Sequence, residues 1–188
     1  MKLQLVSIAF LLAACGAAHA ANGVIVVTWN ASATPTPCAP AGVTLGKLPV
    51  CPANTSFQAL AISLGGSRGS VTGPTSFSDI ALLKNTDPSS SALFLAMLEG
   101  KPLGNVLISV YSPNDIAVAG TGTPIASYTL TLTGSPVTSI ADSAGGTLPQ
   151  QSITLSYATI NYSYIVHNAS GTQDSLAFTY NRLTNTFR

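Results

Sequence analysis

The sequence predicts a mainly β fold, an antiparallel β-barrel or sandwich that carries one short α-helix. Short segments rich in β-branched and aromatic residues recur along the chain, and several have apolar residues at every second position. Turn residues separate these segments, and a helical pattern occurs only once. Many strands with a single helix indicate antiparallel pairing. The expected strands are residues 24–29, 57–64, 77–83, 106–110, 128–133, 153–166 and 176–180.

The single helix is expected to begin near Asp87 and to end at Gly100. Asp87 can accept hydrogen bonds as the N-cap residue, and Pro88 suits the first helical position. Residues 92–98 are almost wholly apolar, and Gly100 can adopt the left-handed conformation that ends a helix. A helix that is apolar on most sides must be covered on most sides, which favours packing against a sheet and also against a neighbouring subunit.

The longest expected strand, residues 153–166, changes the face on which its apolar residues lie. The first face carries Ile153, Leu155 and Tyr157, and the second carries Ile160, Tyr162 and Tyr164. A bulge near Ala158 would explain the change, and so would a strand that serves two cores or an interface.

The first twenty residues resemble a bacterial secretion signal. Lys2 supplies a positive charge, residues 5–14 contain no charged residue, and small residues flank His19 at Ala18 and Ala20. Cleavage after Ala20 would leave Ala21 as the mature N-terminus. The apolar stretch is shorter than the roughly 20 residues that a membrane span needs.

A second processing route is open. Residues 12–16, Leu-Ala-Ala-Cys-Gly, resemble the lipobox of bacterial lipoproteins, in which Cys15 would be lipidated and become the N-terminus. Both routes export the protein to the periplasm or the extracellular space. They differ in whether the product is free or lipid-anchored.

The two remaining cysteines, Cys38 and Cys51, are expected to form a disulfide. An even pair in an exported protein is typical of a disulfide, and the bridge would contribute about 3 kcal/mol in the chain-entropy model. A metal site lacks ligands, because the pair is not in a CxxC motif and His167 is the only other histidine after His19. The expected organisation is a signal in 1–20, a strand and Pro/Ala-rich loop with the disulfide in 21–56, and a β-barrel domain in 57–188.

Charge is scarce, at 7 % of the residues. Removal of Lys2 leaves six basic residues (7 − 1) and six acidic residues, so the net charge of the mature chain is near zero. No basic patch for a nucleic acid is visible, and no later segment is suited to spanning a membrane. Weak electrostatic repulsion between copies makes self-association easy.

With its elements in this order, the chain resembles the Hcp family, the haemolysin-coregulated proteins that form the tube of type VI secretion systems. The resemblance covers residues 57–187 and is strongest in residues 77–96, which hold a strand, a Lys followed by Asp and serines, and the apolar helix. Further similar segments are residues 99–101, 129–132, 137–140 and 153–164.

This resemblance implies a β-barrel with a helix at its side, a ring of six subunits, and rings that stack into a tube. It also implies that the protein acts by assembly and as a carrier for effectors, without catalysis. Tube proteins of that family lack a secretion signal, and the loop with the cysteine pair is additional to the family pattern.

Catalytic motifs are weak. Residues 65–69 match GxSxG around Ser67, and Asp142 and His167 follow in the order of a hydrolase triad. The nucleophile elbow needs a helix directly after the serine, whereas a Gly- and Pro-containing turn follows here. We therefore expect no catalytic residue, no metal site and no cofactor. Tyr157, Tyr162 and Tyr164 could line a ligand site, but β-strands favour aromatic residues for packing.

The sequence therefore predicts an exported, non-catalytic structural protein that assembles into rings or tubes and binds other secreted proteins. Its expected partners are further copies of itself, in a hexameric ring, with no nucleic acid and with a membrane only if Cys15 is lipidated. The alternative is a monomeric, secreted or lipid-anchored β-domain that binds a ligand or a surface.

Overall fold

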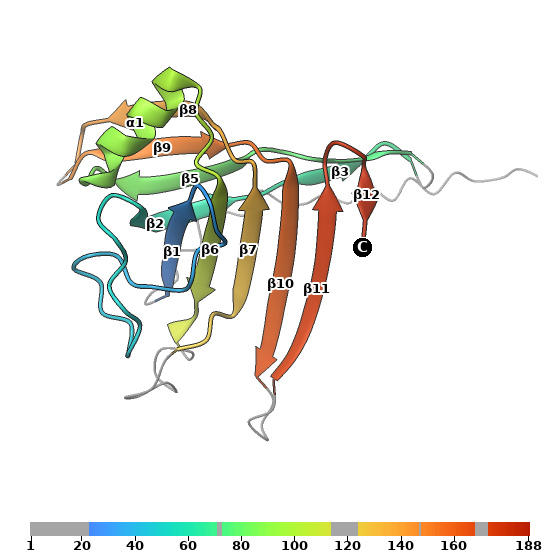
Figure 1. The fold of residues 1–188 in the computed structure, drawn as a ribbon, viewed down its shortest axis with the longest axis horizontal. Helices are drawn as coiled ribbons and strands as arrows, with labels where there is room; N and C mark the ends of the chain where they lie inside the picture. Colours follow the sequence, from blue (N-terminus) through green and yellow to red (C-terminus); the bar gives the residue numbers. More distant parts are fainter. Residues whose placement is uncertain (1–22, 71–72, 114–123, 147, 168–172) are drawn as a thin grey trace, which may run out of the picture.

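A computed structural model describes residues 23–70, 73–113, 124–146, 148–167 and 173–188 of the chain. Its elements are twelve strands and one helix (Figure 1). The strands are β1 (Val24–Asn30), β2 (Ser56–Ser63), β3 (Gly66–Arg68), β4 (Thr75–Phe77), β5 (Ile80–Asn85), β6 (Asn105–Tyr111), β7 (Tyr128–Thr133), β8 (Val137–Ser143), β9 (Gln150–Leu155), β10 (Thr159–His167), β11 (Gln173–Asn181) and β12 (Thr186–Phe187). The helix is α1 (Ser89–Glu99). The prediction of a mainly β architecture with one short helix is thus confirmed.

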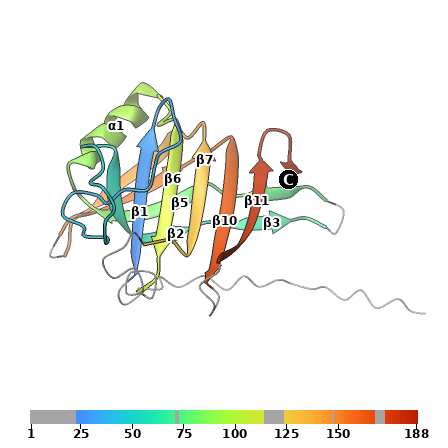
Figure 2. The ribbon, with the colours of Figure 1, turned by 60° about the horizontal axis from the view of Figure 1, so that its bottom comes forward.

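Ten strands form one antiparallel sheet in the order β12-β11-β10-β7-β6-β1-β2-β5-β9-β8, and β3 pairs with β4 in a separate hairpin. The sheet folds over between β1 and β2, so that β1, β6, β7, β10 and β11 stand across β2, β5, β9 and β8 (Figures 1 and 2). Helix α1 lies beside β8 and β9 at one end of the molecule.

The main hydrophobic core fills the space between the two halves of the folded sheet. Val106 and Leu132 face it from one half, and Ile80, Leu82 and Ile153 face it from the other, each almost completely buried. Leu93 is the helix residue buried in this core.

The prediction of one continuous strand over residues 153–166 is wrong, because β9 ends at Leu155 and β10 starts at Thr159. Backbone hydrogen bonds from Ser156 to Pro136 and from Ala158 to Thr133 hold the link between them. β9 pairs with β5 and β8 in one half of the sheet, whereas β10 pairs with β7 and β11 in the other. The apolar face changes because the two halves face the same core from opposite sides.

A second, smaller core lies on the other side of β1 and β6. Val26 and Tyr111 of these strands pack there with Leu45, which comes from the loop 31–55 between β1 and β2. Cys38 and Cys51 form a disulfide across this loop. A parallel bridge between Ala39 and Val50 lies next to the disulfide and joins the two arms of the loop to each other.

Helix α1, the single helix among the described residues, is too short to span a membrane.

Candidate functional site

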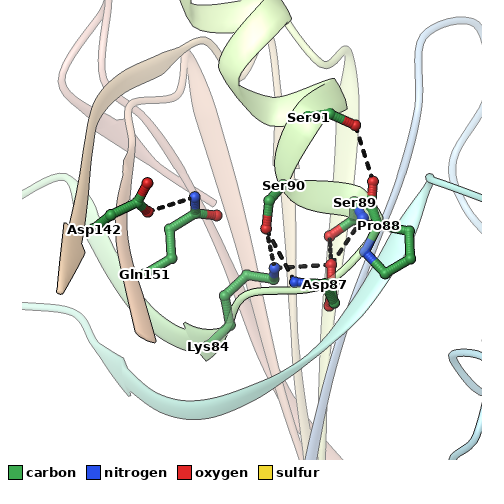
Figure 3. Close-up of polar contacts among 8 residues, drawn as sticks. All are labelled: Lys84, Asp87, Pro88, Ser89, Ser90, Ser91, Asp142 and Gln151. Carbon is green, nitrogen blue, oxygen red and sulfur yellow. Dashed lines mark hydrogen bonds and ion pairs between the residues drawn. The ribbon is translucent and has the colours of Figure 1, made fainter. Parts of the chain in front are cut away.

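Helix α1 is fixed to the sheet at its first turn by a buried lysine (Figure 3). Lys84, in β5, has no exposed surface, and its Nζ lies 2.8 Å from Oδ1 of Asp87 and donates to Oγ of Ser90 at 2.9 Å. The same Asp87 oxygen accepts the backbone N–H of Ser89 at 2.8 Å, which is the capping bond expected from the sequence. Pro88 already has helical dihedral angles. One carboxylate therefore caps the helix and pairs with the lysine.

Burial lowers the pKa of the Lys84 ammonium below its usual value of 10.5, because burial disfavours the charged form. The hydrogen bond from Lys84 to Asp87 and the charge of Asp87 oppose this shift. The ring of Phe57 lies 5.2 Å from the ammonium and adds a cation–π contact. Because its amine is fully buried and bonded, Lys84 is suited to holding the helix rather than to reacting with a substrate.

A polar row extends from Lys84 across the sheet. Gln151 of β9 is its direct neighbour in the strand register, and Asp142 of β8 is the next. Nε2 of the buried Gln151 donates to Oδ1 of Asp142 at 2.9 Å (Figure 3). Lys84 and Gln151 are buried, which was not predicted from the sequence, whereas Asp142 is exposed. The signal was present in the alternation of Ile80, Leu82 and Lys84, which puts the lysine on the core-facing side of β5.

The outer side of α1 is apolar and open to solvent. Leu95 is 55 % exposed and Leu98 is 77 % exposed, whereas Leu93 is buried. The helix ends at Gly100 in the left-handed conformation (φ +63°), as the sequence predicts. Large exposed apolar side chains on one face of a helix mark it as a candidate interaction surface.

A groove of about 500 Å³ lies beside this face. Leu95 and Ala96 line it from the helix, Trp29 from the end of β1, and Pro35 and Pro52 from the loop 31–55. The outer face of α1 and this groove are called the α1 surface below. It is largely apolar, which fits a protein partner better than an ionic ligand.

The residues of the weak hydrolase motif do not form such a motif in the structure. Ser67 is exposed in the short strand β3, where the motif needs a strand that leads into a helix. Asp142 is bound to Gln151, and the backbone of His167 ends β10 while its side chain lies outside the described part. Within the described residues, no three His, Cys, Asp or Glu side chains are grouped as a metal site would require.

The tyrosines considered for a ligand site have different surroundings. Tyr157 is buried and its hydroxyl donates to the carbonyl of Ser78 at 3.1 Å. Tyr162 stacks between two other aromatic rings, those of Tyr128 and Phe178. Tyr164 is partly exposed. Tyr157 and Tyr162 therefore serve packing.

The predicted processing residues Cys15, Ala20 and Ala21 lie outside the described residues.

The model of the family described as type VI secretion system effector, Hcp, matches residues 55–164, which are 110 of the 188 residues. No curated protein matches the chain in sequence.

Solved structures are similar in fold at low sequence identity. Hcp1 from Salmonella typhimurium has a TM-score of 0.64 at 13 % identity, covering 88 % of this chain and 99 % of that one. A type VI secretion system effector from Yersinia pestis has a TM-score of 0.56 at 19 % identity, covering 84 % and 98 %. A type six secretion system protein has a TM-score of 0.65 at 14 % identity, covering 89 % and 100 %. Since the family model matches more than half of the residues and the fold agrees, this chain belongs to the Hcp family of type VI secretion system effectors.

Proposed function

We propose that this protein is an exported subunit that assembles into a hexameric ring, stacks into tubes and binds other secreted proteins. Hcp proteins are structural tube components rather than enzymes, and the family match over residues 55–164 carries the proposal. Their mode of action is contact between surfaces, so the relevant features of this chain are its exposed apolar faces.

Two features of the molecule support assembly. The α1 surface exposes leucines that a monomer would leave in water, and their burial between copies would be favourable. The formal net charge of the sequence is only +1, so copies repel one another weakly.

Light scattering of the refolded, oxidised chain from residue 21 onward tests the assembly. We expect a species of six times the protomer mass, in equilibrium with smaller species on dilution. A strict monomer at high concentration would contradict the ring and would favour the alternative of a monomeric ligand-binding β-domain.

We further propose that the chain leaves the cytoplasm, with Ala21 as its first residue after cleavage. Mass spectrometry of the N-terminus of the protein from the exporting cell tests this directly. A free Ala21 supports a soluble product, and an acylated Cys15 would show a lipid-anchored one. An intact Met1 in the product would contradict export through this signal.

A further inference from the structure

A rigid turn between β11 and β12 holds an apolar side chain out into solvent. Leu183, in this turn, is 83 % exposed. Oδ1 of Asn181 accepts the backbone N–H of Leu183 at 2.9 Å and that of Thr184 at 3.1 Å. The guanidinium of Arg182 bonds the carboxylate of Asp79. The turn is therefore preorganised, and a partner that buried Leu183 would not have to order it.

Two neighbours extend this projection into a surface. Phe187 of β12 is partly exposed and lies 4.9 Å, between ring centroids, from Tyr180. Arg188 is exposed, and its backbone N–H and carbonyl both pair with Thr179 at 2.9 Å. Leu183, Phe187 and Arg188 are called the turn surface below. It combines two apolar side chains with the guanidinium of Arg188.

The α1 surface offers the acidic Glu99 to the basic Arg188 of the turn surface, and the basic Lys101 also lines its groove. Among the four acidic side chains that the structure describes, three are bound: Asp79 to Arg182, Asp87 to Lys84 and Asp142 to Gln151. The fourth, Glu99, is exposed at the last turn of α1 and has no ion pair within the described residues. Arg188 also lacks an acidic partner there. Glu99 and Arg188 could thus pair between copies, beside the leucines.

The two surfaces lie at opposite ends of the molecule. Figures 1 and 2 both place α1 and the loop 31–55 at the left end of the molecule and the turn between β11 and β12 towards its right end. Both α1 and this turn lie along the upper edge in these views. An apolar projection that fits a groove elsewhere on the same molecule makes a head-to-tail contact, which closes into a ring when the rotation permits.

From these observations we infer that neighbouring copies meet head to tail, with the turn surface of one copy docked on the α1 surface of the next. The inference rests on the proposed function, because it names the surfaces that the ring joins. Leu183 enters the groove beside Leu95, Phe187 covers Leu98, and Arg188 approaches Glu99. The loop 31–55, through Pro35 and Pro52, supplies the far wall of the groove.

Substitutions on both surfaces test this arrangement in the oxidised chain from residue 21 onward. Leu98→Asp and Leu183→Asp should each raise the concentration at which the assembly dissociates, measured by light scattering, by about tenfold or more. Leu176→Asp is the matched control, since Leu176 of β11 is 73 % exposed and lies outside both surfaces. At a concentration low enough to dissociate the unmodified protein as well, the melting temperatures of all three should stay close to that of the unmodified protein.

Mixing the two disrupted variants gives a signature that only a head-to-tail contact produces. Leu98→Asp keeps an intact turn surface and Leu183→Asp keeps an intact α1 surface, so an equimolar mixture should form a heterodimer and stop there. The single changes Glu99→Arg and Arg188→Glu should weaken assembly, and their combination should restore it. If the Leu98→Asp protein, the Leu183→Asp protein and their mixture all form rings as the unmodified protein does, the inference is wrong and the proposed function stands. A monomeric unmodified protein would overturn both.

Discussion

Replacing Lys84 with methionine should lower the free energy of unfolding by about 2 to 3 kcal/mol. Breaking a buried ion pair by removing one partner costs about 3–5 kcal/mol, because the other charge is left without compensation. Here Nζ of Lys84 is fully buried 2.8 Å from the Asp87 carboxylate, whose side chain is 33 % exposed. Asp87 also keeps its bond from the N–H of Ser89, so water and this bond relieve part of the penalty. The expected cost therefore falls below that range.

Urea unfolding of the oxidised protein measures this cost, with all variants at one protein concentration because assembly adds to the apparent stability. Lys47→Met is the matched control, since Lys47 is exposed in the loop 31–55 and does not line the groove, and it should change the free energy by less than about 0.5 kcal/mol. Asp87→Asn keeps the capping oxygen and removes the charge, so the double variant with Lys84→Met should lose less than the sum of the single losses. Equal losses in the Lys84→Met and Lys47→Met proteins would refute this account of the helix anchor.

Three further predictions concern other parts of the fold. Burial raises the pKa of Tyr157 to about 12 in the folded chain, whereas the unfolded chain loses the phenol proton near the usual pKa of 10. The free energy of unfolding should therefore fall between pH 10 and 12. Unfolding measured across this range should show a less steep fall for Tyr157→Phe. The double change Cys38→Ala and Cys51→Ala should cost about 3 kcal/mol in urea unfolding, since the bridge joins residues 13 apart, and an unchanged midpoint would contradict this. Gly104→Ala should cost more than about 3 kcal/mol, because φ is +86° and a Cβ would lie 2.5 Å from a backbone atom of the loop after β1. Gly100→Ala is also at positive φ but faces open space, so it should cost about 1 kcal/mol. Equal melting temperatures for the two variants would refute the argument.

Local patterns in the sequence predicted the helix and the strands β1, β2, β5, β6, β7 and β11, whereas β3, β4, β8 and β12 were not expected. Alternating apolar residues in residues 128–133 predicted β7, and the Asp87, Pro88 and Gly100 signals predicted both ends of α1. The division of residues 153–166 into two strands could not be predicted from a local pattern. Whether a change of apolar face means a bulge or a crossing between two halves of a sheet depends on pairing partners far along the chain.

The candidate site was harder to predict than the fold. The burial of Lys84 follows from the alternation in β5, but its pairing with Asp87 requires the helix to turn back over that strand. The groove beside α1 combines the helix, the end of β1 and the loop 31–55, which are separate in the sequence and pack together only in the folded chain. No local pattern encodes such a surface.

The loop 31–55 carries the disulfide and also packs against the sheet. The family match begins at residue 55, so most of this loop lies outside the matched region, yet the loop covers one face of β1 and β6. Leu45 is almost fully buried there against Val26 and Tyr111, and the disulfide closes the loop around it. Disulfides persist in oxidising compartments and are rare in the cytoplasm. In a reducing compartment the same loop would lose this constraint, and with it part of the groove wall beside α1. An Hcp fold that carries such a bridge is therefore more stable under oxidising conditions, and its assembly should weaken when the bridge is reduced.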